Sequence, residues 1–145
     1  MRTLLLAFLF LFPTVLAASD CDRERVLALN MYHEARGDGP DGMIMVAEVT
    51  LNRVASNSYP DTICEVVYQR SQFSWTTTRL DHRPSESESW EVAVRLSVGI
   101  LHGEINHFDT GATHFLNPSL LEHIPSWAEE FQVVGRVGDH VFYEM

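Results

Sequence analysis

The chain has 145 residues, with twenty acidic and ten basic side chains and a formal net charge of -10. So acidic a composition excludes a nucleic-acid partner, which would require a basic surface, and it disfavours adhesion to anionic membranes. The length predicts a single domain, and the sequence contains no internal repeat or long linker.

Residues 1–17 have the pattern of a secretory signal peptide. Arg2 supplies the positive charge, a leucine-rich apolar run follows, and small residues end the segment at Ala17. The run is too short to span a bilayer comfortably, although an uncleaved N-terminal anchor is the alternative. We therefore predict that residues 18–145 form the mature domain of a periplasmic or secreted protein, without stable membrane association after cleavage.

The chain has two cysteines, Cys21 and Cys64, and both lie in the predicted mature segment. An isolated pair in an oxidising compartment predicts a disulfide. Closing a loop of this length would stabilise the fold by on the order of 4 kcal/mol. Two free buried thiols are the alternative, because sequence does not show whether the cysteines are close in space.

Capping residues and apolar spacing predict two helices at the start of the mature chain. The first lies within residues 19–37, with Ser19 or Asp20 as its N-cap and Gly37 as its stop. The second covers residues 41–54. Its predicted inner stripe consists of Met43, Val46, Ala47, Thr50 and Val54.

A short third helix is predicted from about residue 61 to residue 69. Thr62 and Glu65 have the spacing of a capping box at its start. Residues 71–85 show no clean periodicity and predict a surface loop, where binding groups are often found.

A fourth helix is predicted within residues 85–103. Ser85 and Glu88 match a capping box, and Gly103 is its predicted stop. Its predicted buried stripe consists of Trp90, Val94, Ser97 and Leu101. Residues 111–127 are rich in turn residues, and Gly138-Asp139 predicts a short hairpin between β-branched and aromatic residues. These elements predict a mainly helical α+β domain with a small C-terminal β element.

Glu34 is the strongest candidate for a catalytic side chain. It follows Leu27 and Met31 at helical spacing, so it shares their apolar face and is expected to be partly desolvated. Its place in the last helical turn adds the negative end of the helix dipole. Both effects raise the pKa of a carboxyl, as a general acid near neutral pH requires. Arg36 would oppose them if it turned toward Glu34.

Other chemistries have weaker signals. The run HEARG lacks the second histidine of the H-E-x-x-H zinc motif, because position 37 is glycine. Seven histidines are many for this length, and a zinc site built from scattered histidines is an open alternative, but their spacing is not that of metal ligands. The chain has no G-x-S-x-G elbow and no phosphate-binding glycine loop. We predict no metal and no cofactor.

Aromatic residues beside polar groups indicate a glycan-binding cleft. Sugars are held by ring stacking together with amide and hydroxyl hydrogen bonds. The candidates in such a setting are Tyr32, Tyr68, Phe73, Trp75, Phe115 and Trp127. Tyr32 and Trp127 are among the residues predicted to bind substrate, and for any single ring a place in the core is the alternative.

Several segments resemble the SleB-type cell wall hydrolase family of spore cortex-lytic enzymes. They are, in order, YHEARGDGPDGMIMVAEVTLNRV, YPDTICEVVYQRSQFSW, ATHFLNP, PSW and VGRVGDHVFYEM. Together they cover nearly all of the predicted mature chain. The resemblance implies that residues 18–145 are a catalytic domain with a lysozyme-like fold, similar to lytic transglycosylases. It also implies cleavage of the β-1,4 bond between N-acetylmuramic acid and N-acetylglucosamine in peptidoglycan glycan strands.

The resemblance also assigns residues. The catalytic glutamate of the family's E-A-R-G motif corresponds to Glu34, and the implied cleft residues are Gln72, Phe73, His114, Phe115 and Asn117. Two positions depart from the family pattern: Asp38 stands where glutamate is usual, and Phe115 where tyrosine is frequent.

Counting carboxylates favours a lytic transglycosylase. Retaining and inverting hydrolases need two carboxylates, whereas a transglycosylase works with one, because the muramoyl 6-hydroxyl attacks C1. Glu34 would then act as acid and base and leave a 1,6-anhydromuramic acid end. The alternatives are a muramidase that uses water with Asp38 as second carboxylate, a non-catalytic peptidoglycan-binding module, and a zinc amidase or endopeptidase.

Overall fold

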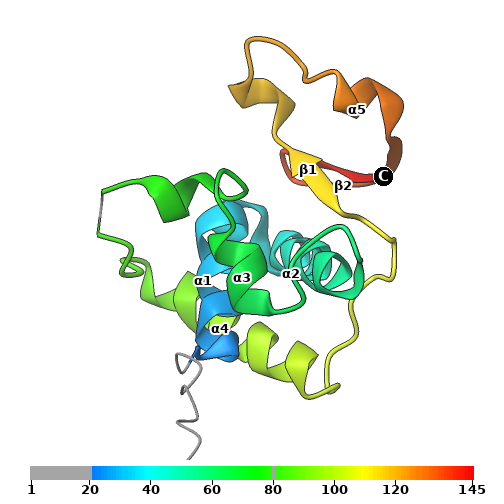
Figure 1. Cartoon of the computed structure of the whole chain (residues 1–145). Coiled ribbons are helices and arrows are strands. Elements are labelled where there is room, and N and C mark those ends of the chain that lie inside the picture. The colour runs from blue at the N-terminus through cyan, green and yellow to red at the C-terminus, as the bar shows by residue number, and fades with distance from the viewer. Residues whose placement is uncertain (1–20, 80) are drawn as a thin grey trace, which may run out of the picture.

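The computed structural model describes residues 21–79 and 81–145, so the predicted signal peptide, residues 1–17, lies outside the described part. A body of helices carries a small sheet on one side (Figure 1). In chain order the elements, with η for a 3-10 helix, are α1 (Arg23–Ala35), η1 (Arg36–Asp38), α2 (Gly39–Ala55), α3 (Ile63–Tyr68), η2 (Ser74–Thr77), α4 (Ser87–Leu101), β1 (His114–Leu116), η3 (Pro118–Leu120), α5 (Trp127–Glu130), β2 (Gln132–Val137) and β3 (His140–Glu144). The predicted α+β class, mainly helical with a β element near the C-terminus, is confirmed.

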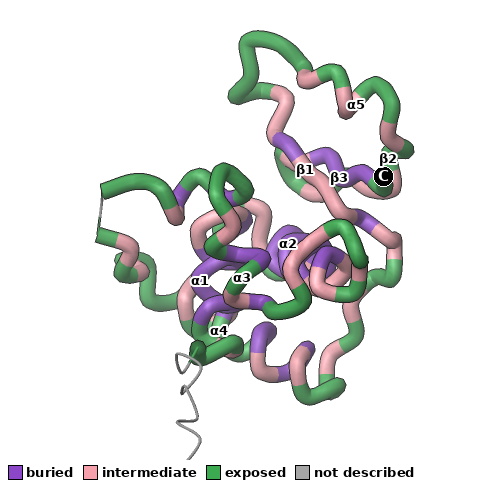
Figure 2. Tube along the Cα trace, viewed as in Figure 1, coloured by how far each residue is buried: buried purple, intermediate pink, exposed green. Residues whose placement is uncertain are grey.

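Helix α1 is the centre of the helical body. All residues from 26 to 32 are buried, because α2, α3 and α4 each pack against it. Figure 2 shows the buried stretches gathered on α1 and α2, with the loops exposed. A helix surrounded on several sides needs no polar face, and this is why the pattern of α1 is less amphipathic than that of a surface helix.

The ends of α1 differ from the prediction. Asp22 is the N-cap, and its side chain accepts a hydrogen bond from the Arg25 backbone N–H at 3.0 Å. The expected caps at residues 19–20 were therefore wrong. At the other end, α1 continues directly into η1, which contains Gly37, so Gly37 is not the predicted stop. The chain turns at Gly39, whose φ of 72° favours glycine.

Helix α2 confirms the predicted second helix, and most of its predicted inner stripe is buried. It also buries two ionisable residues outside that stripe, Glu48 and Arg53. Helix α3 begins as predicted, since the Thr62 side chain accepts from the Glu65 backbone N–H at 3.2 Å.

Helix α4 begins one residue later than the predicted capping box implies. The Ser85 N–H donates to the Tyr32 hydroxyl at 3.1 Å instead of serving the helix, and Glu86 is the N-cap. The helix ends as predicted at Gly103 (φ 74°), where the Glu104 N–H reaches the Gly99 carbonyl at 2.8 Å. The buried stripe runs through Ala93, Leu96, Ser97 and Ile100, so the predicted stripe was rotated on the helix surface.

The sheet has the order β1-β3-β2, with both pairs antiparallel. Strands β2 and β3 form the predicted hairpin, which turns at Gly138 (φ 54°). The short strand β1 pairs with the other edge of β3, which the sequence pattern did not predict. Phe142 on β3 is fully buried and joins the sheet to the main core.

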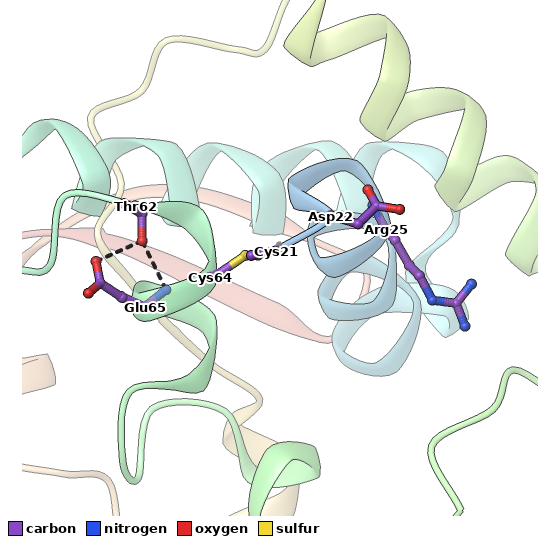
Figure 3. The surroundings of a disulfide bond; sticks show 6 residues. All are labelled: Cys21, Asp22, Arg25, Thr62, Cys64 and Glu65. Carbon is purple, nitrogen blue, oxygen red and sulfur yellow. Dashed lines mark hydrogen bonds between the residues drawn. A yellow bond between two sulfur atoms is a disulfide. The ribbon is translucent and has the colours of Figure 1, made fainter. Parts of the chain in front are cut away.

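The predicted disulfide between Cys21 and Cys64 is present, with a Cα–Cα distance of 6.5 Å. Figure 3 shows that it ties Cys21, ahead of the N-cap of α1, to Cys64 in α3. Within residues 21–79 and 81–145, no helix has the length and apolar character needed to cross a membrane.

Candidate active site

Glu34 lies in the last turn of α1 and is half-buried. Leu27 and Met31, which share its face, are fully buried. Burial raises the pKa of the Glu34 carboxyl to about 7, while the positive charge of Arg53 acts to lower it. The expectation of a desolvated carboxyl on the apolar face is therefore confirmed, and burial is the dominant cause.

Arg53 on α2 supplies the positive charge near Glu34. It is only 5% exposed, and burial lowers the pKa of its guanidinium. Arg36, which would oppose the rise in pKa if it turned toward Glu34, is engaged by other groups. Its Nε donates to Glu86 at 2.8 Å, and its guanidinium lies over the Tyr32 ring at 5.0 Å.

Four groups hold the Arg53 guanidinium in place. Its Nε donates to the Thr113 carbonyl at 2.8 Å, and its Nη1 donates to the Gln72 side-chain oxygen at 3.1 Å. The guanidinium also lies over the rings of Tyr59 and Phe73, at 5.1 and 5.3 Å from their centroids. These contacts join α2 to the segments before η2 and β1.

His114, the first residue of β1, extends this cluster. Its Nε2 lies 3.3 Å from the Tyr59 hydroxyl, and its Nδ1 lies 2.9 Å from the Thr113 hydroxyl. Burial, followed by the charge of Arg53, lowers the pKa of His114, so the imidazole is neutral near pH 7. We call Glu34, Arg53, Tyr59, Gln72 and His114 the Glu34 cluster.

Two predicted substrate contacts, Tyr32 and Phe73, are corrected by their burial. The two rings are 2% and 1% exposed, and rings so buried cannot stack on a sugar. The Tyr32 hydroxyl accepts the N–H groups of Ser85 and Glu86, both at 3.1 Å, and thereby fixes the start of α4. The Phe73 ring instead packs against the Arg53 guanidinium.

The other predicted cleft residues lie along β1 and α5. Phe115 is half-buried and packs against Phe142 at a ring distance of 5.5 Å, which places it toward the sheet core. Asn117 uses its side-chain oxygen to cap η3 through the Ser119 N–H at 3.0 Å. Trp127 lies beside His114, with ring centroids 5.1 Å apart, and is therefore next to the Glu34 cluster.

Asp38, the candidate second carboxylate, faces the β2–β3 hairpin. One carboxylate oxygen accepts the Asp139 N–H at 3.0 Å and the other pairs with the His140 ring. Its side chain is 8% exposed. A Cβ at Gly138 would collide with Asp38, so the glycine serves both the turn and this contact. Asp38 is a structural tie between η1 and the hairpin.

Sequence reasoning missed Arg53 and Tyr59. A signal for Arg53 was present, because Val46, Thr50 and Arg53 follow the same helical spacing that identified Glu34. An arginine on the inner face of a helix needs a buried partner. Tyr59 carried no comparable signal, since it lies in the loop between α2 and α3.

His33, which neighbours Glu34 in the sequence, is engaged by other groups. His33 stacks on Trp75 at 4.7 Å, and its Nε2 lies 3.0 Å from the His82 carbonyl oxygen. Among residues 21–79 and 81–145, no group of three or more His, Cys, Asp or Glu side chains is arranged to hold a metal ion.

The family model described as Cell Wall Hydrolase matches residues 37–143, beginning just after Glu34. The chain belongs to the cell wall hydrolase family. The resemblance predicted from its motifs is therefore confirmed.

Curated relatives are spore cortex-lytic enzymes. The one from Halalkalibacterium halodurans is 28% identical over 118 residues, which is 81% of this chain and 33% of the relative. That from Bacillus subtilis is 27% identical over 123 residues, 83% of this chain and 37% of the relative. This chain thus spans about a third of the length of these two proteins.

Two solved structures have the same fold. The catalytic domain of the Bacillus cereus SleB protein gives a TM-score of 0.63 at 22% identity, covering 86% of this chain and 91% of that one. The catalytic domain of SleB from Bacillus anthracis, a germination-specific lytic transglycosylase, gives 0.62 at 22% identity, with 87% and 98% covered. The predicted lysozyme-like α+β fold is confirmed by this likeness.

Proposed function

We propose that this cell wall hydrolase degrades peptidoglycan by cleaving the β-1,4 bond between N-acetylmuramic acid and N-acetylglucosamine. The observation that carries the proposal is the half-buried Glu34 carboxyl, whose pKa of about 7 suits a general acid at neutral pH. The names of the chain's relatives and the match to the cell wall hydrolase family support peptidoglycan as the substrate class. Peptidoglycan lies outside the cytoplasm, in agreement with the predicted signal peptide at residues 1–17.

In the first step, protonated Glu34 donates its proton to the glycosidic oxygen as the bond from C1 to that oxygen breaks. The positive charge of Arg53 favours the Glu34 carboxylate that forms. In the second step, the muramoyl 6-hydroxyl attacks C1 and passes its proton to Glu34. The products are a free 4-hydroxyl on N-acetylglucosamine and a 1,6-anhydromuramic acid end, and Glu34 is protonated again.

One catalytic carboxylate is favoured over two. Asp38 is held by the β2–β3 hairpin. Glu48 is fully buried, and its oxygens accept the N–H groups of Asp109 and Thr110 at 2.9 and 2.6 Å. Neither carboxylate is therefore available to activate a water molecule, as an inverting hydrolase requires, or to attack C1, as a retaining hydrolase requires.

The chemical ends of the released muropeptides test this proposal. Mature protein incubated with purified peptidoglycan should release muropeptides with anhydromuramoyl ends, as measured by mass spectrometry. Glu34→Gln should abolish release, because the amide cannot transfer the proton, whereas Glu91→Gln on the exposed side of α4 should not. EDTA should leave the products unchanged.

Four other outcomes would each contradict part of the proposal. Unchanged cleavage by Glu34→Gln would contradict the role of Glu34. Reducing sugar ends would make water the nucleophile. Free stem peptides, or loss of activity with EDTA, would indicate an amidase or endopeptidase.

A further inference from the structure

Glu48 on α2 is a fully buried carboxylate that binds the chain segment leading to β1. Its oxygens accept the backbone N–H of Asp109 at 2.9 Å, the backbone N–H of Thr110 at 2.6 Å and the Thr110 hydroxyl, also at 2.6 Å. The ring nitrogen Nδ1 of His107 lies 3.4 Å from Oε2 of Glu48. Consecutive backbone N–H groups aimed at one carboxylate form the kind of concavity that binds anions. The segment 107–113 is therefore folded around an anion that α2 supplies.

The backbone of this segment has an unusual conformation. Asp109 has a φ of 57° and Gly111 a φ of 76°, both in the left-handed region. Such a φ is unfavourable for a residue other than glycine and persists where the surrounding contacts hold it. Both N–H groups that Glu48 accepts belong to this bend, one at Asp109 and one at the residue after it. The buried charge of Glu48 thus stabilises a conformation that the chain would not adopt readily on its own.

A continuous set of hydrogen bonds leads from Glu48 to the first residue of β1. The Thr110 hydroxyl, which donates to Glu48, accepts the backbone N–H of Ala112 at 3.3 Å. The next residue, Thr113, has its hydroxyl 2.9 Å from Nδ1 of the His114 ring. The position of Glu48 is in this way passed on to the side chain of His114.

The start of β1 presents two side chains that we predict to bind glycan. His114 and Trp127 are both half-buried, with ring centroids 5.1 Å apart, so each ring keeps some exposed surface beside the other. Partly exposed rings and polar ring nitrogens are groups that hold sugars. Glu48 is fully buried and cannot touch a glycan itself. Its effect on substrate must therefore pass through residues 109–113.

We propose that Glu48 is a positioning residue for glycan binding, which acts through residues 109–113 and sets the orientation of the His114 ring at the start of β1. This inference rests on the proposed function, because it takes peptidoglycan glycan strands as the ligand of β1. Glu34 lies on a different element, α1, and its proton transfer uses no group of residues 109–113. Loss of the Glu48 charge should therefore weaken binding of the strands and leave the chemical step nearly unchanged.

Thr110 offers a matched pair of variants for the test. Thr110→Val removes the hydroxyl that joins Glu48 to Ala112 and keeps the shape of the side chain, whereas Thr110→Ser keeps the hydroxyl. With solubilised glycan strands, Thr110→Val and Glu48→Gln should each raise KM by about tenfold, the effect of losing one hydrogen bond to a charged group. Their kcat should change by less than about threefold, because the lost interaction serves binding. Thr110→Ser should keep KM near its wild-type value.

A merely structural role for Glu48 would give a different result. It would reduce the amount of folded enzyme, so kcat would fall while KM stayed unchanged, and that outcome would overturn the proposal. An equal rise in KM for Thr110→Val and Thr110→Ser would do the same. The double variant Cys21→Ser/Cys64→Ser, which removes a cross-link between α3 and the residue ahead of the N-cap of α1, is the control for stability lost elsewhere and should keep the wild-type KM. The Thr110 pair carries the test if Glu48→Gln does not fold.

The His114 ring gives a second readout that needs no substrate. Its ring nitrogen NMR resonances, assigned by their absence from His114→Gln, should shift in Glu48→Gln and Thr110→Val and stay in place in Thr110→Ser. The ring resonances of His33 on α1 are the internal control and should not move. Unchanged His114 resonances in both Glu48→Gln and Thr110→Val would overturn the proposal.

The proposed function and the role of Glu48 fail separately. Continued cleavage by Glu34→Gln would remove the acid–base role of Glu34. Calorimetric titration of glycan strands into Glu34→Gln, with and without Glu48→Gln, measures binding without turnover. Equal affinities in that pair would overturn the role of Glu48 and leave the acid–base role intact.

Discussion

At the scale of the residue, burial of the Glu34 carboxyl suits proton transfer and costs stability. Its pKa is raised from 4.5 to about 7, so the folded chain holds a proton that the unfolded chain releases between these values. The resulting loss in the free energy of unfolding is absent below pH 4.5 and complete above about pH 7. Glu34→Gln should therefore stabilise the fold at pH 8 by roughly 1 to 3 kcal/mol and have little effect at pH 4. Urea unfolding at both pH values measures this. Equal effects at the two values would contradict it, and Glu91→Gln is the control.

At the scale of the element, Asp38 ties the hairpin of β2 and β3 to the start of α2. Asp38→Ala would leave the Asp139 N–H and the His140 ring without this partner. Losing such hydrogen bonds to a charged group should cost about 2 to 3 kcal/mol in the free energy of unfolding. Amide exchange should quicken in the hairpin before it does in α1. Asp41→Ala, at an exposed position in the first turn of α2, should have little effect. Any anhydromuramoyl products of Asp38→Ala should keep their chemistry, whereas a switch away from them would show that Asp38 takes part in the reaction.

At the scale of the whole molecule, the disulfide Cys21–Cys64 closes a loop of 43 residues that contains α1, α2 and the Glu34 carboxyl. The cross-link limits the unfolded chain, so the double variant Cys21→Ser/Cys64→Ser should lose about 2 to 5 kcal/mol of unfolding free energy. Dithiothreitol should lower the melting temperature of the wild type to that of the variant and leave the variant unchanged. A wild type insensitive to reductant would contradict the prediction.

Much of the helical part could be predicted because its signals are local. Thr62 caps α3 through a residue three positions away, and Gly103 ends α4 with bonds inside the same turn. The start of α4 was mispredicted because the Tyr32 hydroxyl, more than fifty residues earlier in the chain, takes the N–H groups of Ser85 and Glu86. Strand β1 was missed for a similar reason, since it pairs with β3 across a long connection.

The same division applies to the candidate site. Helical spacing with Leu27 and Met31 was sufficient to predict that Glu34 is desolvated, because residues four and seven positions apart share a face whatever the rest of the fold does. The choice of Arg53 over Arg36 as its counter-charge, and the direction of Asp38 toward the hairpin, were decided only in the tertiary structure. The direction of a side chain near a helix end depends on partners distant in sequence. For Arg53 and Asp38 these partners are Thr113 and His140, which reach the cluster and η1 only when the sheet packs on the helical body.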